Sequence, residues 1–433
     1  MSDTIFALST ASGRAGIAIV RVSGPQAKAA LVSLSGREDF PPRQAIRARL
    51  SDAGGHPLDD ALVLWFPGPA SFSGEDIAEF HLHGGRSIID AVLRALSSLP
   101  GLRPSEPGEF TRRAVRNGKL DLTRAEGLAD LIDAETESQR LQALRQYDGA
   151  FARLCDGWRD RLIKATAWVE AAIDFADEEL PEETVARSSQ IAGEILKEIQ
   201  DHLTDSQRGE IIRNGVHLTV FGPVNAGKSS LINALARRDV AIVSPTPGTT
   251  RDVIEVHLDL GGYAVIASDT AGLRPTEEAV EAEGVRRALD RARSADLTLL
   301  LLDGARPDTF TNYQVEPDLV VWNKADVEWS TERDGIRISA KTGEGLDFLI
   351  ESLVKIIAQR LDVKGDSVPI TRTRHRHALE QAVAALTRSL NEEEAELMAE
   401  DLRLTLREIG RVTGRVDIED LLDVVFRDFC IGK

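Results

Sequence analysis

The chain has 433 residues and a formal net charge of −18, with 42% hydrophobic and 28% charged residues. This composition is typical of a globular protein with several buried cores, and it excludes disorder as the main state. Two cysteines exclude a disulfide framework and a cysteine-rich zinc site. The N-terminus lacks the basic and apolar segments of a signal peptide, and the longest apolar runs are too short to cross a membrane. We therefore expect a protein of the reducing cytoplasm, whose acidic field lets it bind nucleic acid only through a local basic patch.

The first region, residues 1–118, mixes β-like runs with Gly/Pro turn signals. Strands are expected at 16–24, 61–66 and 77–83, and an apolar stretch at 88–99 predicts a helix. This texture predicts a compact α+β domain.

Two further regions, 119–212 and 363–433, are expected to be helical. Between Leu144 and Ala172 the apolar residues recur three and four positions apart, which predicts one long helix with a continuous buried stripe. A second helix is expected around 184–206. The simplest architecture is an all-α domain built from both regions, with another domain inserted between them.

The inserted region, 213–362, alternates apolar strands with helical segments. This pattern predicts βαβ units and a mostly parallel α/β sheet. Its strands are expected at 216–222, 263–269, 297–303, 319–324 and 336–341.

A phosphate-binding loop follows the first of these strands. The segment GPVNAGKS (222–229) lies between a strand and a helix, which is the context that a P-loop requires. Its glycines let the backbone wrap around phosphates, and the helix N-terminus points free amides at them. Lys228 would reach the β- and γ-phosphates, and Ser229 would ligate Mg²⁺.

Three later segments narrow the ligand to a guanine nucleotide. Asp326 of NKAD (323–326) can accept both hydrogen bonds from the guanine amidine edge, and DTAGL (269–273) and SAK (339–341) also end strands. In this order the segments resemble the boxes of Ras-like, translation-factor-type GTPases. GTTRD (248–252) supplies Thr250 as a second Mg²⁺ ligand. The residues expected to bind GTP are Asn225, Ala226, Gly227, Lys228, Ser229, Ser230, Ser244, Pro245, Thr246, Pro247, Gly248, Thr249, Thr250, Asp269, Thr270, Ala271, Gly272, Asn323, Lys324, Asp326, Ser339, Ala340 and Lys341.

One position departs from Ras-type GTPases. Leu273 stands where those proteins place the glutamine that orients the attacking water. Another group must align the water. Pattern alone leaves four acids of the next segment open: Glu277, Glu278, Glu281 and Glu283.

Beyond these boxes, the whole chain resembles the MnmE/TrmE family of bacterial tRNA uridine-modification GTPases. SGRAGIAIVRVSG (12–24), FSGEDIAEFHLHGG (72–85), PGEFTRRAVRNGKLDLTRAE (107–126) and the closing CIGK (430–433) are similar to the family's terminal signatures. GPVNAGKSSLINAL and PGTTRDVIE are similar to its G domain. The motifs lie in the family's order on three regions of the chain.

The resemblance implies an N-terminal domain that binds a folate and mediates a homodimer. It implies an FAD-containing partner, MnmG, in a heterotetramer. Together they would install an aminomethyl or carboxymethylaminomethyl group on carbon 5 of the wobble uridine of certain tRNAs. 5-Formyl-tetrahydrofolate or a related tetrahydrofolate would supply the one-carbon unit, and glycine or ammonium the nitrogen. The family's folate positions fall on Arg21, Glu79, Lys119 and Lys433. Arginine and lysine suit the anionic glutamate tail, and a carboxylate suits the pterin amidine edge.

The resemblance also implies roles in catalysis. The family's water-orienting acid falls on Glu281, and its cysteine proposed to act in the modification falls on Cys430. Asn225 brings an amide oxygen to the phosphates but no charge, which suits a potassium ion in place of an arginine finger. The remaining potassium ligands would come from the switch I loop, at Ser244, Thr246 and Thr249.

Several alternatives stay open. His81 and His83 alternate on one strand, but no third ligand with suitable spacing accompanies them, so we expect no metal there. The basic segments 112–119 and 372–377 either meet tRNA phosphates or neutralise acids of the helical domain. The competing function is a ribosome-assembly or regulatory switch GTPase without substrate chemistry, which would share the same GTPase boxes.

Overall fold

The structure is a computed structural model that is described in nine segments and a few single positions near the C-terminus. The described residues are 3–11, 13–175, 183–238, 240–242, 255–269, 293–306, 315–327, 334–361 and 369–416, together with 422, 425, 426, 429 and 432. Their contacts divide the chain into two compact units. The first comprises 1–129, 152–159 and 406–433, and the second comprises 130–151 and 160–405. The finer division at residues 118, 212 and 362 stays a prediction.

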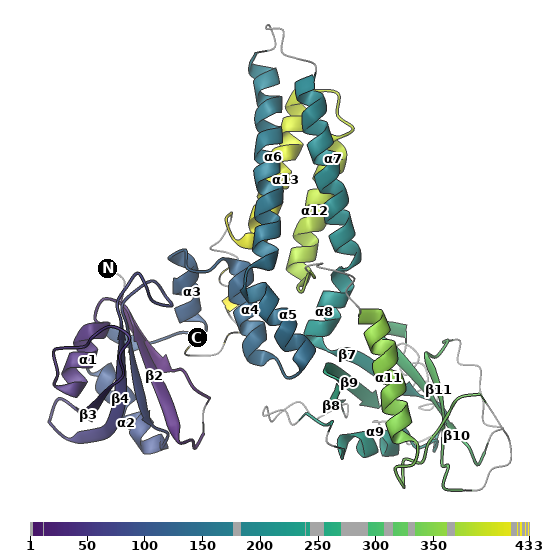
Figure 1. Cartoon of the computed structure of the whole chain (residues 1–433), viewed down its shortest axis with the longest axis horizontal. Coiled ribbons are helices and arrows are strands. Elements are labelled where there is room, and N and C mark those ends of the chain that lie inside the picture. Colours follow the sequence, from purple (N-terminus) through teal and green to yellow (C-terminus); the bar gives the residue numbers. More distant parts are fainter. Residues whose placement is uncertain are drawn as a thin grey trace, which may run out of the picture. The chain divides into compact units, whose positions relative to one another are not determined.

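The first unit contains a six-stranded sheet in the order β3-β4-β5-β2-β1-β6, antiparallel except for the β1–β6 pair (Figure 1). Its elements are β1 (Thr4–Leu8), β2 (Ile17–Ser23), α1 (Ala27–Ser35), β3 (Ile46–Ser51), β4 (Pro57–Phe66), β5 (Ile77–His83), α2 (Arg86–Ser97), β6 (Leu102–Pro104) and α3 (Glu109–Arg116). Alternate residues of the strands pack under α1 and α2 in one core, which confirms the expected α+β class. The other sheet face carries the polar side chains considered below. Pattern reasoning missed β1 and β3.

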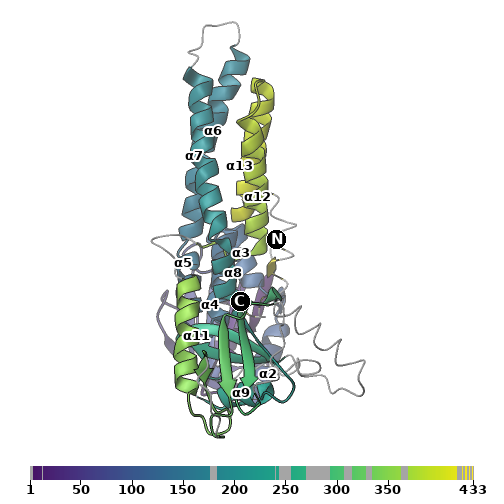
Figure 2. The ribbon, with the colours of Figure 1, turned by 90° about the vertical axis from the view of Figure 1, so that its right-hand side faces the viewer.

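A helix bundle lies mostly in the second unit, although residues 152–159 and 406–413 of its helices belong to the first. Its helices are α5 (Glu137–Tyr147), α6 (Ala150–Asp174), α7 (Glu183–Thr204), α8 (Ser206–Asn214), α12 (Thr373–Ser389) and α13 (Ala395–Thr413), and α4 (Leu122–Asp133) precedes them. Figures 1 and 2 show α6, α7, α12 and α13 side by side. The Ser188 hydroxyl donates to the Ala165 carbonyl between α7 and α6, and Arg388 pairs with Asp401 between α12 and α13. No helix of the described part could span a membrane.

The prediction of one long helix from Leu144 to Ala172 is wrong. The chain forms two helices, because Gly149 adopts φ of +82° between α5 and α6. Only glycine enters this left-handed region without steric cost, so the helix breaks there. The buried stripe itself is confirmed from Phe151 to Val169 within α6.

The inserted region forms a second sheet of six strands, in the order β12-β11-β10-β7-β9-β8. Its elements are β7 (Val216–Phe221), α9 (Lys228–Ala236), β8 (Glu255–Leu260), β9 (Tyr263–Asp269), β10 (Leu297–Asp303), β11 (Leu319–Asn323), β12 (Ile336–Arg337) and α11 (Leu346–Leu361). All strand pairs are parallel except β8–β9, as expected for a mostly parallel α/β sheet. The last strand is shorter than the predicted 336–341, because the chain turns at Ser339. The multidomain fold class is therefore confirmed, with a sheet whose strands end on the candidate site.

Candidate functional site

The P-loop lies between β7 and α9, at the carboxyl end of the central strand. Gly222 and Gly227 have φ of +145° and +97°. A Cβ at Gly222 would collide with the Leu301 carbonyl oxygen, and a Cβ at Gly227 would collide with the Asn323 side-chain amide. Both glycines are therefore required by conformation and by space. The turn they allow brings the N-terminus of α9 to the strand end, where free amides can receive an anion.

Lys228 is folded back into this loop. Its Nζ donates to the carbonyls of Gly222 at 3.0 Å and Pro223 at 2.9 Å, and the residue is 8% exposed. Ser229 follows it in the first turn of α9 and is exposed. The loop thus has the shape for a polyphosphate, and the Ser229 hydroxyl lies where a P-loop serine holds Mg²⁺.

Asn323 ties three loops together at the same edge of the sheet. Its Nδ2 donates to the Ala226 carbonyl at 2.8 Å, and its Oδ1 accepts from the Ala340 amide at 3.0 Å. The side chain is 3% exposed. The P-loop and the segments at 323–326 and 339–341, which the sequence predicted to meet, are brought together by this one amide.

The expected base-reading carboxylate is held in place but is open to solvent. Ser339 donates its hydroxyl to Asp326 Oδ1 at 2.7 Å, and Ser339 itself is fully buried. This hydrogen bond, with Lys341 and Lys324 nearby, holds the pKa of Asp326 below its ordinary value. Asp326 is therefore a carboxylate at neutral pH that can accept two hydrogen bonds from a planar donor edge.

The remaining nucleotide positions fall outside the described residues. Asp269 ends β9 beside Val220 of β7, and only its backbone is described. The predicted nucleotide positions outside the described residues are Ser244, Pro245, Thr246, Pro247, Gly248, Thr249, Thr250, Thr270, Ala271 and Gly272. The candidate catalytic residues Glu281 and Cys430 and the candidate folate residue Lys433 also lie outside them.

A second cluster lies on the open face of the first unit's sheet. Arg21 and Glu79 stand directly opposite each other on β2 and β5. Arg21 donates through Nε at 3.0 Å and Nη2 at 2.8 Å to Glu79 Oε1, and His81 Nε2 lies 3.3 Å from Oε2. The side chains of Arg21 and Glu79 are 24% and 14% exposed, so these two residues form a partly desolvated ion pair.

Aromatic rings and a lysine complete this cluster. The Arg21 guanidinium lies 5.6 Å from the ring centre of Phe72 and 5.9 Å from that of Phe110. Lys119 lies beside the loop that carries Phe72: a Cβ added at Gly74 would lie 3.3 Å from Lys119 Cε. The structure thus places Arg21, Glu79 and Lys119 around one short loop.

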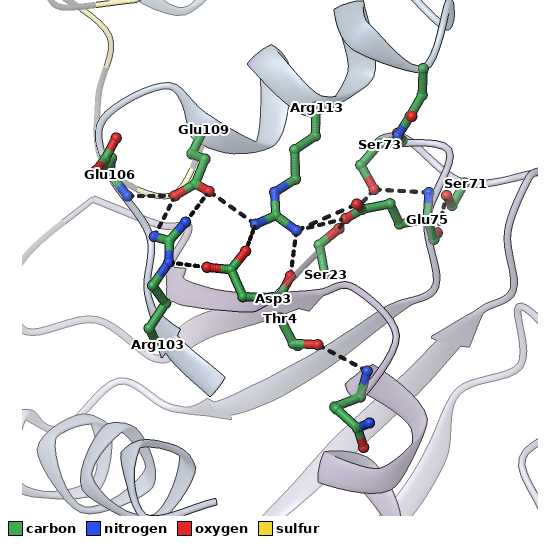
Figure 3. A network of polar contacts seen from close by, with 12 residues as sticks. Asp3, Thr4, Ser23, Ser71, Ser73, Glu75, Arg103, Glu106, Glu109 and Arg113 are labelled. Carbon is green, nitrogen blue, oxygen red and sulfur yellow. Dashed lines mark hydrogen bonds and ion pairs between the residues drawn. The ribbon is translucent and has the colours of Figure 1, made fainter. Parts of the chain in front are cut away.

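A polar network holds that loop and α3 on the sheet (Figure 3). Arg113 Nη1 donates to the Asp3 carbonyl at 2.8 Å and to Glu75 Oε2 at 3.1 Å, and its Nη2 donates to Asp3 Oδ1 and Glu109 Oε1. Arg103 also binds Asp3 and Glu109. Because Arg113 is only 9% exposed, each of these bonds replaces water that the guanidinium has lost.

The network keeps two of its carboxylates, Glu109 and Asp3, ionised. Burial alone would raise the pKa of Glu109, but hydrogen bonds from Arg103, the Glu106 amide and Arg113 lower it below its ordinary value. The hydrogen bond from Arg103 likewise lowers the pKa of Asp3. Sequence reasoning did not identify this network, because two of the acids that bind Arg113, Asp3 and Glu75, are distant in the sequence.

Other expectations concern histidines and basic segments. His81 faces Glu79 and His83 pairs with Asp59 at 2.8 Å, and the described part of the chain holds no group of three or more His, Cys, Asp or Glu that could hold a metal. In the basic segments, Arg113 is buried in its network, Arg372 pairs with Asp130 and Arg376 with Glu210. These three arginines favour the neutralising role over phosphate contact.

Gly432, the described residue of the C-terminal signature, lies against the end of β1. Ser9 donates its hydroxyl to the Gly432 carbonyl at 2.9 Å, and a Cβ at Gly432 would collide with the Leu8 carbonyl oxygen. Only glycine fits there, at φ of +95°. Residue 432 is therefore anchored at the end of β1.

The sequence matches two domain families, the GTP-binding protein TrmE N-terminus over residues 4–119 and the MnmE helical domain over 122–430. It is similar to a tRNA modification GTPase MnmE of Paramagnetospirillum magneticum, with 52% identity over 100% of both chains. It is also similar to the human mitochondrial 5-taurinomethyluridine-[tRNA] synthase subunit GTPB3, with 48% identity over 99% of this chain and 93% of that one. Among solved structures, the G domain of the T. maritima FeoB iron transporter aligns over 33% of this chain and 99% of its own, at 24% identity and a TM-score of 0.26.

Proposed function

The chain belongs to the MnmE family of tRNA modification GTPases, and on that premise we propose a specific activity for it. It is a potassium-activated GTPase that acts as a homodimer with an FAD-containing MnmG partner in the cytoplasm. The pair adds an aminomethyl or carboxymethylaminomethyl group to carbon 5 of the wobble uridine of certain tRNAs. A tetrahydrofolate supplies the one-carbon unit.

The observation that carries this proposal is the presence of two polar clusters in one chain. Asn323 joins the P-loop to the base-reading segments, and Arg21 with Glu79 forms a partly buried charge pair on a different sheet. A switch GTPase without substrate chemistry needs only the first cluster. We therefore favour the enzyme over the ribosome-assembly alternative.

In the nucleotide cluster, GTP is the substrate of hydrolysis. Water attacks the γ-phosphorus, the bond to the bridging oxygen of the β-phosphate breaks, and GDP and phosphate leave. Lys228 exchanges its two carbonyl partners for phosphate oxygens, a stronger interaction because these acceptors are charged. Asp326 selects guanine, Ser229 with Thr250 would hold Mg²⁺, which neutralises phosphate charge, and Glu281 would orient the water.

Asn225 would provide the potassium specificity. It is exposed in the P-loop and has φ of +64°. Its amide oxygen, with Ser244, Thr246 and Thr249, would hold K⁺ beside the phosphates, where the ion supplies the positive charge that an arginine finger supplies elsewhere.

The folate proposal concerns the cluster around Arg21. Because Arg21 and Glu79 contact each other, they meet the same end of a bound ligand. The carboxylate suits the amidine edge of a pterin, and the anionic tail of a folate then suits Lys119 and Lys433. We propose Cys430 as a candidate residue for the modification chemistry itself.

The experiment that tests the GTPase part compares hydrolysis in KCl and NaCl at equal ionic strength, which removes general salt screening. Hydrolysis should be much faster in potassium. Asn225→Gly should abolish the difference while GTP stays bound, since glycine adopts a positive φ without strain. Equal rates in both salts for the unmodified protein contradict potassium activation, and normal hydrolysis by Glu281→Ala contradicts the role of that acid.

A further inference from the structure

A buried acid that no sequence motif indicated lies behind the base-reading segment. Asp303 ends β10, directly beside Asn323 of β11. Its Oδ2 lies 2.6 Å from Lys324 Nζ, and its Oδ1 accepts from the Ala305 amide at 3.0 Å. The side chain is 7% exposed, so both oxygens have exchanged water for protein partners.

The partner of Asp303 has an unfavourable backbone. Lys324 has φ of +70°, a left-handed conformation that is strained for a residue with a Cβ. Such a conformation persists only where its surroundings impose it, and these positions gather at functional sites. Among the described residues, Arg43, Asn225 and Lys324 are the non-glycine residues with positive φ, and two of them belong to the nucleotide cluster.

Several hydrogen bonds fix the turn at Lys324. On its N-terminal side, Asn323 is fixed by Ala226 and Ala340. On its C-terminal side, the Ala325 amide donates to the Ile338 carbonyl, and the Val327 amide donates to the Lys324 carbonyl. The Lys324 side chain is held by Asp303, which binds its ammonium. Two residues later the chain reaches Asp326, the exposed carboxylate that Ser339 holds.

We propose that Asp303 is a positioning residue of the guanine site. By holding the Lys324 ammonium, it keeps the left-handed turn formed before nucleotide arrives, and so places Asp326 for the base. The inference rests on the proposed guanine site and adds to it a residue that does not touch the ligand.

The test uses the full-length chain and the variant Asp303→Asn. Asparagine keeps the shape and the acceptor for the Ala305 amide but removes the charge that holds Lys324. We expect the affinity for GDP, measured with a fluorescent GDP analogue, to fall about tenfold, the size of one charge-assisted hydrogen bond. KM for GTP should rise by a similar factor, while kcat at saturating GTP changes less than about twofold.

A double-mutant cycle separates positioning from general stability. Lys324→Gly removes the ammonium and tolerates the left-handed turn, so Asp303→Asn should have no further effect on GDP affinity in that background. The matched control is Asp318→Asn. Asp318 accepts from Thr298 between the same two strands, at their opposite end, so its loss should lower the unfolding temperature without changing GDP affinity.

Three results would overturn the inference. The first is an unchanged GDP affinity in Asp303→Asn. The second is that Asp303→Asn lowers GDP affinity equally in the unmodified and the Lys324→Gly backgrounds. The third is an equal loss of GDP affinity in Asp318→Asn. If the unmodified protein does not prefer GDP to ADP, the guanine site itself is wrong. If the unmodified protein prefers GDP and Asp303→Asn binds GDP with the same affinity, only the proposed role of Asp303 is wrong.

Discussion

The nucleotide cluster and the cluster around Arg21 differ in the atoms that fix their geometry. At the nucleotide cluster, short side chains bind backbone groups of loops, as Asn323 does with Ala226 and Ala340. Around Arg21, long side chains on strand faces bind one another, and the Arg113 network fixes the loop and helix beside them. In the first cluster an exposed side chain such as Asp326 can be changed while Asn323 still joins the loops. In the second, each loss leaves a partly buried charge without its partner.

The largest expected effect tests the independence of single groups in the nucleotide cluster. Guanine donates two hydrogen bonds to a carboxylate, whereas xanthine offers one donor and one acceptor, which an amide side chain matches. Asp326→Asn should therefore lower GTP affinity by about 10²-fold or more and raise the affinity for xanthosine triphosphate. Competition binding measures both. A variant that loses both nucleotides equally would show that the loops depend on Asp326 for their shape.

An intermediate effect tests the interdependence expected around Arg21. Arg21→Ala removes a charged partner and leaves Glu79 bound to His81 alone, so binding of 5-formyl-tetrahydrofolate should weaken about tenfold or more. Calorimetry on the full chain measures it. Arg47→Ala, which removes an exposed arginine paired with Asp60 on the same sheet, is the matched control and should bind normally. Equal affinity of the two variants would remove Arg21 from the site.

The smallest effect concerns the network that supports this cluster. Glu109→Gln leaves Arg103 and Arg113 short of a charged acceptor, which should destabilise the first unit by about 1 kcal/mol at neutral pH. The pKa of Glu109 is lowered in the folded chain, so its contribution is present above its ordinary value of 4.5 and is lost as pH falls through the folded pKa.

Hydrogen exchange of β1 and α3 reads this effect locally. Exchange should be faster in Glu109→Gln than in the unmodified chain at pH 7, and the difference should shrink towards pH 3. A difference that stays constant with pH would mean that the charge of Glu109 contributes nothing.

Sequence reasoning located the nucleotide cluster because its residues come in contiguous motifs at strand ends. Each motif carries its own local context, and the parallel sheet brings the strand ends together. Asp303 was missed because a single acid at the end of a strand has no distinguishing pattern. Its importance depends on the left-handed backbone of Lys324, which only the structure reveals.

The cluster around Arg21 could not be located from sequence patterns, in contrast to the nucleotide cluster. Arg21 and Glu79 are 58 positions apart and meet only through the antiparallel register of β2 and β5. Composition and periodicity could not supply that register, and only the family resemblance singled these residues out. The predicted long helix ran through Gly149 because the spacing of apolar residues contains no information on the positive φ of that glycine.

The central claim, that this chain serves wobble-uridine modification, is tested most directly by mass spectrometry of tRNA nucleosides from cells that lack its gene. We predict that the aminomethyl-type group at carbon 5 of the wobble uridine disappears. The unmodified gene should restore it, whereas genes carrying Lys228→Ala or Arg21→Ala should not. Unchanged modification in cells without the gene would contradict the claim.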